Sequence, residues 1–350
     1  MMSKIALYRK YRPQKFEEVS GQDHIVGILK NAVKLGRISH AYLFSGPRGT
    51  GKTSVARILA KEAGCSDVDL VEIDAASSRG IDEIRSLRDG VRFSPLRGEV
   101  KVYIIDEVHM LTKEAFNALL KTLEEPPKHA IFILATTEED KVPATIVSRC
   151  QHFSFRKIPH NVLAKAMISG AQKEGFEIDK DAADLIALFA EGSFRDALGM
   201  LDQLFSLGDN DENKKITGEE ARRFLSIPSS RAVEKFISSV VKKDAKAGIE
   251  TIEEAIGNNL NMKMFFKLIL RNIRAMLLLR VAPEMKNTIK EAFTEEEFEF
   301  LEKNKNIPKD GELERALEIF LDSYDSQSRS YLPQIPIELA LLKITSSKSS

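Results

Sequence analysis

The stretch Gly46-Pro47-Arg48-Gly49-Thr50-Gly51-Lys52-Thr53 fits the pattern G-x-x-x-x-G-K-[ST]. An apolar, strand-like segment at residues 41–44 leads into it, and a helical pattern at residues 54–61 leads out of it. This order of strand, loop and helix distinguishes a phosphate-binding loop from a chance match. Its glycines let backbone N–H groups turn inward around phosphate oxygens, and the helix that follows directs its positive dipole end at the same place. The sequence therefore predicts an α/β domain that binds a nucleotide.

Residue types around this loop indicate triphosphate chemistry. Lys52 can reach the β and γ phosphates, and the Thr53 hydroxyl is placed to ligate Mg²⁺. A second apolar strand pattern, residues 101–105, ends at Asp106 and Glu107. Asp106 can hold Mg²⁺ directly or through water, and Glu107 can then polarise the water that attacks the γ-phosphate. Taken alone, the two carboxylates would indicate only a strand that ends at acidic residues. Their position about fifty residues after a phosphate loop favours a role in binding the metal and activating water.

Three more residues are candidates for contact with the γ-phosphate. A third apolar strand ends at Thr136 and Thr137; one of these threonines could orient the attacking water or contact the γ-phosphate, and we favour Thr137. Arg149, in Ser148-Arg149-Cys150, would lie far from its own phosphate loop and could act on a neighbouring subunit's nucleotide. Arg195 starts a helix of a second domain and could fold down onto the γ-phosphate. For both arginines a surface position is the alternative, and spacing alone does not decide for Arg195.

Composition sets wider limits. The chain has 350 residues, a size at which two or three domains are expected. Its net charge is zero, so any contact with DNA must use a local patch. Two cysteines exclude a disulfide framework and fit a reducing compartment. The first residues lack the apolar core of a signal peptide, and the apolar stretch at residues 264–282 is interrupted by charges, so we expect a cytoplasmic protein without a membrane span.

The pattern along the chain predicts three domains, 1–157, 158–226 and 227–350. In the first, parallel strands are expected at residues 41–44, 70–73, 100–105, 131–135 and 152–155. Helices are expected between them at residues 51–63, 80–88 and 113–123. After residue 159 strand signals vanish, and we expect only helices, at residues 161–174, 180–190, 195–207 and 217–225, with a loop at residues 208–215. The last domain reads as entirely helical, with a frayed tail at residues 346–350.

Several segments together resemble the AAA+ ATPases and, more narrowly, the gamma/tau family of bacterial DNA polymerase III clamp-loader subunits. The most specific of them is Ile105-Asp106-Glu107-Val108-His109-Met110-Leu111. The resemblance is dense through about residue 205 and faint beyond residue 227. The other matching segments are residues 7–13, 21–22, 40–46, 72–77, 116–127, 135–137, 148–150 and 195–198.

The resemblance implies a role for each candidate. Asp106 and Glu107 would be the Walker B pair, Thr137 sensor 1, Arg195 sensor 2 and Arg149 the arginine finger. ATP and Mg²⁺ are the implied cofactors, with Thr53 and Asp106 as metal ligands. The implied nucleotide-binding residues are Leu7, Tyr8, Arg12, Pro13, Val19, Gly21, Gln22, Gly46, Pro47, Arg48, Gly49, Thr50, Gly51, Lys52, Thr53, Ser54 and Arg195.

The resemblance also implies a fold and a function. The fold would be a P-loop AAA+ parallel-sheet domain of RecA-like type, followed by a small helical lid and a helical collar that oligomerises. The chain would be the ATP-driven motor subunit of a replicative clamp loader, an ATPase acting within the DNA polymerase III holoenzyme, which is a DNA-directed DNA polymerase. It would open a sliding clamp and load it onto primer–template DNA.

Partners follow from the same resemblance: delta-type and delta-prime-type subunits in a hetero-oligomer of five, the sliding clamp, and DNA gripped through its phosphates. Basic residues that could contact those phosphates are Arg79, Arg85, Arg92, Lys113 and Lys121.

Three alternatives stay open. A branch-migration helicase would be another AAA+ DNA motor, but the helical, non-basic end of the chain argues against its winged-helix domain. A DExH helicase, suggested by Asp106-Glu107-Val108-His109, needs a second RecA-like domain, so His109 more simply packs or supports its neighbours. An ATP-binding scaffold subunit of the loader would not turn over nucleotide, and the intact set of Lys52, Asp106 and Glu107 argues against it.

The sequence departs from the family pattern in two ways. Family members usually carry four cysteines in a zinc module between the first helix and the second strand, whereas residues 64–69 here contain only Cys65. One cysteine cannot form a tetrahedral site, so we expect no structural zinc. The chain also lacks the additional C-terminal domains of the longer tau form, which suggests the short form or a truncated piece.

Overall fold

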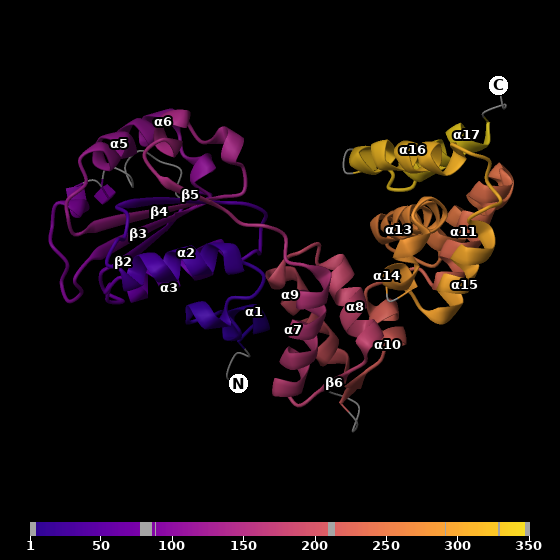
Figure 1. Cartoon of the computed structure of the whole chain (residues 1–350), viewed down its shortest axis with the longest axis horizontal. Coiled ribbons are helices and arrows are strands. Elements are labelled where there is room, and N and C mark those ends of the chain that lie inside the picture. The colour runs from indigo at the N-terminus through magenta and orange to yellow at the C-terminus, as the bar shows by residue number, and fades with distance from the viewer. Residues whose placement is uncertain are drawn as a thin grey trace. The chain divides into compact units, whose positions relative to one another are not determined.

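The structure is a computed structural model that describes residues 5–77, 86–87, 89–208, 214–290, 292–327 and 330–346 (Figure 1). It divides into two compact units, residues 1–218 and residues 219–350. The division falls inside the short helix α10 (Gly218–Phe224). The domain boundaries expected after residues 157 and 226 stay predictions.

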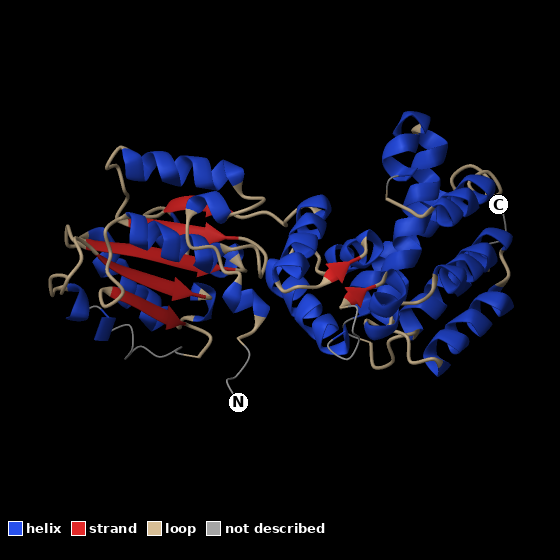
Figure 2. Ribbon diagram, turned by 90° about the horizontal axis from the view of Figure 1, so that it is seen from below, coloured by secondary structure: helices blue, strands red, loops and turns tan. Residues whose placement is uncertain are grey.

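A five-stranded sheet in the order β2-β3-β4-β1-β5 forms the centre of the first unit, and every neighbouring pair of strands runs parallel (Figure 2). All five predicted strands are present, each displaced by no more than one residue at either end. The strands β1, β3 and β4 are near-continuous buried apolar runs, which is why the sequence pattern located them well, whereas β2 and β5 at the two edges of the sheet are more polar and more exposed. The strands are β1 (Ala41–Ser45), β2 (Leu70–Asp74), β3 (Lys101–Asp106), β4 (Ala130–Thr136) and β5 (Gln151–Ser154).

Helices cover both faces of this sheet (Figure 1). On one face, α2 (Asp23–Lys34) and α3 (Lys52–Glu62) enclose a core that includes Tyr42 and Phe44. On the other face, α5 (Lys113–Glu124) and α6 (Ala144–Val147) pack over Leu43. Successive side chains of β1 therefore enter opposite cores, as the pleat requires. Most of the helix predicted at residues 80–88 lies outside the described residues. Short elements of this unit are α1 (Leu7–Lys10), η1 (Phe16–Glu18), η2 (Val108–Met110) and η3 (Glu139–Lys141).

This topology brings the candidate residues to one edge of the sheet. Because the strands are parallel, the carboxyl ends of β1, β3 and β4 meet at the same edge. The phosphate loop leaves β1 there, and the Gly46 N–H donates to the carbonyl of Thr136 at the end of β4 over 3.1 Å. Residues 46–53, 106–107 and 136–137 are consequently neighbours despite their separation in sequence.

A three-helix lid completes the first unit: α7 (His160–Lys173), α8 (Lys180–Phe189) and α9 (Phe194–Gly208). The prediction that no strand follows residue 159 is wrong in one detail. β6 (Glu177–Ile178) and β7 (Lys215–Ile216) pair in parallel. Two residues cannot display an alternating pattern, so the sequence gives no strand signal there.

The second unit is helical, as predicted. Its centre contains the buried rings of Phe236, Phe265, Phe266 and Phe320, which meet edge-on. Among the described residues, no helix combines the length and the apolar character that crossing a bilayer requires. The helices are α11 (Ser230–Lys242), α12 (Ala245–Gly257), α13 (Met262–Val281), η4 (Pro283–Met285), α14 (Lys286–Lys290), α15 (Glu295–Asn304), α16 (Glu312–Ser326) and α17 (Ile335–Thr345).

The segment in which relatives were expected to carry zinc is organised by a carboxylate. Asp69 is 1% exposed and accepts hydrogen bonds from the Ser66 hydroxyl and from the backbone N–H groups of Leu96, Arg97 and Gly98. The Ser66 hydroxyl first, and then those three N–H groups, hold the pKa of Asp69 well below its usual range. In the described part of the chain, no cluster of three or more His, Cys, Asp or Glu side chains could hold a metal ion.

Asp69→Ala is expected to lower the melting temperature by roughly 5–10 °C, since its donors lose their common acceptor in a buried place. The folded-state pKa of Asp69 lies below its unfolded value, so its contribution is present above the unfolded pKa and is lost as pH falls. The difference between wild type and variant should therefore shrink below about pH 4. Thermal melts at neutral and acid pH, with the exposed neighbour in Asp67→Ala as control, test this. Equal melting temperatures for the two variants would contradict it.

Candidate functional site

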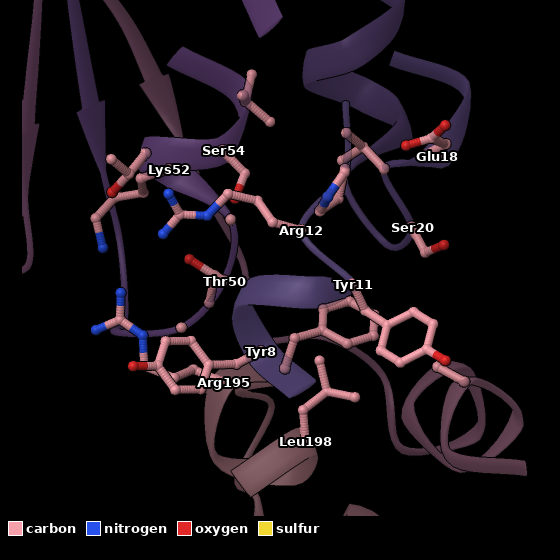
Figure 3. A pocket seen from close by; sticks show the side chains of 18 of the residues that line it. Tyr8, Tyr11, Arg12, Glu18, Ser20, Thr50, Lys52, Ser54, Arg195 and Leu198 are labelled. Carbon is pink, nitrogen blue, oxygen red and sulfur yellow. The ribbon is translucent and has the colours of Figure 1, made fainter. Parts of the chain in front are cut away.

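A cavity of about 550 Å³ lies where the phosphate loop, the N-terminal segment and the lid meet (Figure 3). This volume lies in the range of small-molecule sites. Most of the predicted nucleotide-binding residues line it, together with the two acidic residues that follow β3. The predicted residues in the lining are Tyr8, Arg12, Pro13, Val19, Arg48, Gly49, Thr50, Gly51, Lys52, Thr53, Ser54, Asp106, Glu107 and Arg195.

The remaining predicted residues are not part of the cavity lining. Leu7 is buried, and its N–H lies 3.4 Å from an Asp202 carboxylate oxygen in the lid. Gln22 is fully buried, and its amide donates to the carbonyls of Thr50 and Arg156. It therefore ties the phosphate loop to the segment that follows β5. The other predicted residues outside the lining are Gly21, Gly46, Pro47, Thr137 and Arg149.

Two glycines of the loop occupy places that a side chain could not. At Gly46 (φ +136°) a Cβ would lie 2.3 Å from the carbonyl oxygen of Phe155. At Gly49 (φ +74°) a Cβ would lie 1.9 Å from the Ser193 hydroxyl. The Gly49 carbonyl also accepts from the N–H of Phe194, at the start of α9, over 2.9 Å. The lid is therefore bonded directly to the phosphate loop through a position that only glycine fills without strain.

Lys52 is held inside the loop. It is 6% exposed, and its Nζ donates to the carbonyls of Gly46 (2.8 Å) and Pro47 (3.0 Å). Burial lowers its pKa, while the nearby carboxylates of Glu107 and Asp106 act in the opposite direction. A buried cation thus faces two acidic groups across the site.

Thr53 and Asp106 form a pair of oxygen donors. The Thr53 hydroxyl donates to Asp106 Oδ2 over 2.7 Å, and Asp106 Oδ1 accepts from the N–H of Glu107 over 3.0 Å. Hydroxyl and carboxylate oxygens next to a phosphate loop are what Mg²⁺ prefers, so these residues fit that ion.

Glu107 is positioned by its backbone and by the end of β4. It adopts a left-handed conformation (φ +49°), which is uncommon for a residue other than glycine. Its Oε2 accepts from the Thr137 hydroxyl over 3.0 Å. Glu107 lines the cavity, whereas Thr137, which donates to its carboxylate, does not. Strain at such a position is characteristic of functional sites.

Comparison with known proteins identifies the family to which this chain belongs. The chain is 40% identical to the DNA polymerase III subunit tau of Bacillus subtilis over 98% of this chain and 63% of that protein. It is 40% identical to the DNA polymerase III subunit gamma of Buchnera aphidicola over 69% of this chain and 71% of that protein. The chain belongs to the DNA polymerase III gamma/tau subunit family. The predicted resemblance is thereby confirmed.

Further matches agree with this membership. Residues 21–78 and 65–159 match a family model described as DNA polymerase III, delta subunit, and residues 166–210 match the ATPase lid domain of the DNA polymerase III clamp loader subunit. RuvB, the branch-migration motor of Thermotoga maritima, has the same fold, with a TM-score of 0.53 and 20% identity over 66% of this chain and 79% of that one. The AAA+ fold class is confirmed. The chain spans roughly half to two thirds of the tau relatives, with 46% of the Escherichia coli tau subunit covered at 37% identity.

Within this gamma/tau chain, Arg195 reaches the cavity from the lid. Its guanidinium carbon lies 5.9 Å from the centre of the Tyr8 ring, and both side chains lie beside the phosphate loop (Figure 3). Arg12 is also part of the lining, and burial, chiefly, lowers its pKa. The N-terminal segment and the lid thus contribute cations to the same cavity as Lys52.

Arg149 lies outside the cavity lining, unlike Arg12 and Arg195. Its guanidinium donates to Glu124 at the end of α5 over 2.7 Å and to the carbonyl of Thr145 over 2.9 Å. About a third of its side chain is exposed. Arg149 is therefore a surface residue in this chain, held in place by its own subunit.

Sequence reasoning missed one wall of the cavity. The helix α7 contributes a row of residues three or four positions apart, which is the spacing of one helix face. That periodicity was visible in the sequence, but nothing indicated that this face would meet the phosphate loop. Cavity residues that were not predicted are Tyr11, Glu18, Ser20, Val55, Val162, Lys165, Ala166, Met167, Ser169, Gly170, Lys173, Phe194 and Leu198.

The suggested DNA contacts remain predictions. Arg92, Lys113 and Lys121 are exposed on the first unit. Arg79 and Arg85 lie outside the described residues.

Proposed function

We propose that this gamma/tau subunit binds and hydrolyses ATP to open a sliding clamp and load it onto primer–template DNA. One observation carries the ATPase part: a single cavity brings together the phosphate loop, the Thr53–Asp106 pair, Glu107 and the lid residue Arg195. Membership of the gamma/tau family supports the clamp-loading part.

In this proposal the chain's own groups bind the triphosphate first. Backbone N–H groups at the start of α3 and the ammonium of Lys52 hold phosphate oxygens. Arg195 adds a charge from α9, which is bonded to the loop through Gly49. Because these cations come from both the sheet and the lid, the γ-phosphate favours one arrangement of the two parts, and its loss on hydrolysis releases that arrangement.

Hydrolysis then depends on the acidic pair. Thr53 and Asp106 would hold Mg²⁺, which when bound neutralises charge on the phosphates. Glu107 accepts a proton from the attacking water, and Thr137 keeps the Glu107 carboxylate at the end of β4. We propose that Arg149 completes a neighbouring subunit's site, since it lies at the surface and outside its own cavity.

An assembly is needed for such sharing. The helix α17 exposes an apolar stripe formed by Ile335, Leu339 and Leu342, with Leu339 51% exposed. A contact with another subunit would remove this apolar surface from water. We propose that the second unit is the collar of a hetero-oligomer of five with delta-type and delta-prime-type subunits, working in the cytoplasm within the DNA polymerase III holoenzyme. Gel filtration that finds only monomer with those partners present at high concentration would count against it.

The proposed function is tested by measuring ATP turnover of the assembled loader with and without a sliding clamp and primed DNA. We expect stimulation only when both are present, and co-purification of the clamp with a non-hydrolysable ATP analogue. Lys52→Ala should abolish both. Turnover that Lys52→Ala leaves unchanged would refute the enzyme assignment. Stimulation by branched DNA without any clamp would instead favour a branch-migration motor, and binding without turnover would favour a scaffold subunit.

A further inference from the structure

A carboxylate of the lid holds the N-terminal segment beside the cavity. The Tyr11 hydroxyl donates to Oε1 of Glu174, the C-cap residue of α7. The Lys10 ammonium lies 2.6 Å from the same oxygen, and the Glu174 side chain is only 14% exposed. Tyr11 lines the cavity, whereas Glu174 does not (Figure 3). The contact therefore joins a wall of the cavity to a lid residue 163 positions further along the chain.

The surroundings of Tyr11 keep its hydroxyl a hydrogen-bond donor. Burial in the first place, and then the contact with Glu174, raise the pKa of Tyr11 to about 12. The hydroxyl is therefore protonated at neutral pH and has a proton to donate. The ammonium of Lys173, the last residue of α7, lies 5.7 Å from the centre of the Tyr11 ring. The ring and the hydroxyl thus both contact the C-terminal end of this lid helix.

The N-terminal segment passes from the lid to the sheet along the cavity. Residues 7–11 contact the lid helices α7 and α9, whereas Phe16 belongs to the core that packs on the sheet. Arg12 and Pro13 lie between these two attachments, and both line the cavity. The bond to Glu174 therefore fixes one end of the stretch that carries them.

We propose that Glu174 is a positioning residue for nucleotide binding, because it holds the Tyr11 hydroxyl and so keeps the N-terminal segment docked on the lid as a wall of the cavity. The inference rests on the proposed ATPase function and assigns part of the nucleotide affinity to a lid residue outside the cavity lining. When the segment is docked for only a fraction of the time, the apparent affinity falls by that fraction. The acidic residues that act in hydrolysis are not part of this contact, so the effect should not extend to kcat.

Nucleotide affinity of the full chain tests the proposal first. We expect Glu174→Ala to raise the Kd for a fluorescent ATP analogue by about tenfold, the scale of a hydrogen bond whose acceptor is removed. Tyr11→Phe removes only the hydroxyl and should raise the Kd by about fivefold. In the assembled loader, Glu174→Ala should raise KM by a similar factor as Kd, with kcat within about twofold of wild type.

Further variants separate this bond from general damage to the lid. Glu174→Gln keeps an oxygen that can accept from Tyr11, so it should restore most of the affinity. Lys10→Ala should stay within about twofold of wild type, since Lys10 is 51% exposed and exposed ion pairs contribute little. In the Glu174→Ala background, Tyr11→Phe should cause no further loss, because both changes break the same bond.

Tyr42→Phe is the matched control for removal of a tyrosine hydroxyl. Tyr42 is fully buried, its hydroxyl accepts from the N–H of Ser39 over 2.7 Å, and it lies outside the cavity lining. This variant should leave the Kd unchanged. A loss of affinity equal to that of Tyr11→Phe would show that any buried hydroxyl matters, and it would overturn the inference.

Hydrogen exchange in the absence of nucleotide gives a readout that does not depend on ATPase activity. The N–H groups of residues 9–11 are bonded to carbonyls within α1 and its flanks. They should exchange faster in Glu174→Ala and in Tyr11→Phe, while those of β1 should not.

The outcomes are distinguishable. Wild-type affinity in Glu174→Ala, unchanged exchange at residues 9–11, a loss confined to kcat, or additive losses in the double variant would each overturn the inference. Lys52→Ala, measured in parallel, reports on the proposed function: if that variant binds the analogue as tightly as wild type, the failure lies with the function and not with Glu174.

Discussion

Glu107→Gln is expected to lower ATP turnover by about 10²–10⁴-fold while leaving nucleotide affinity near that of wild type. Glutamine keeps the size of the side chain and can still accept from Thr137, which donates to Glu107 Oε2 over 3.0 Å. It cannot accept a proton from water. The loss should therefore appear in kcat and not in KM.

Single-turnover hydrolysis and equilibrium binding of a fluorescent ATP analogue check this prediction. Glu114→Gln is a suitable control, because Glu114 is exposed in the first turn of α5 and outside the cavity lining. A Glu107→Gln variant that loses affinity but turns over bound ATP at the normal rate would show that Glu107 supports binding and not proton transfer.

Arg149→Ala is expected to lower turnover of the assembled loader by about 10³-fold or more, the scale of a guanidinium supplied in trans. Nucleotide affinity of the isolated chain should be unchanged, because Arg149 lies outside the cavity lining and bonds Glu124 and Thr145 instead. Loss of its exposed ion pair should cost at most about 1 kcal/mol of stability. Arg37→Ala, an exposed arginine after α2, is the control.

Mixing chains tests whether the arginine acts between subunits. An assembly that contains both Arg149→Ala and Lys52→Ala chains can form complete sites, with the phosphate loop from one chain and the arginine from the other. We expect such mixtures to regain turnover that neither variant has alone. If they regain none, or if Arg149→Ala weakens binding in the isolated chain, the assignment of Arg149 is wrong.

Sequence reasoning located the sheet because its three inner strands, β4, β1 and β3, are local apolar runs that end at a polar residue. All five strands matched the prediction, and Lys52, Thr53, Asp106 and Glu107 lie together as expected from the carboxyl edge of a parallel sheet. Local patterns failed where elements were very short. The pair β6 and β7, with two residues each, depends on a contact between segments some 38 positions apart (177 to 215).

The sequence by itself determined the α/β fold class, the phosphate loop and the two acidic residues, since backbone geometry and residue chemistry act within a few positions of the chain. Only the tertiary structure decided that Gln22 ties the loop to the segment after β5, that one face of α7 closes the cavity and that Arg149 is held by Glu124. It alone placed the Tyr11 hydroxyl on Glu174 of the lid. These arrangements depend on which strand lies beside which and on how the lid packs, and such long-range contacts have no signature in the spacing of residues along one segment.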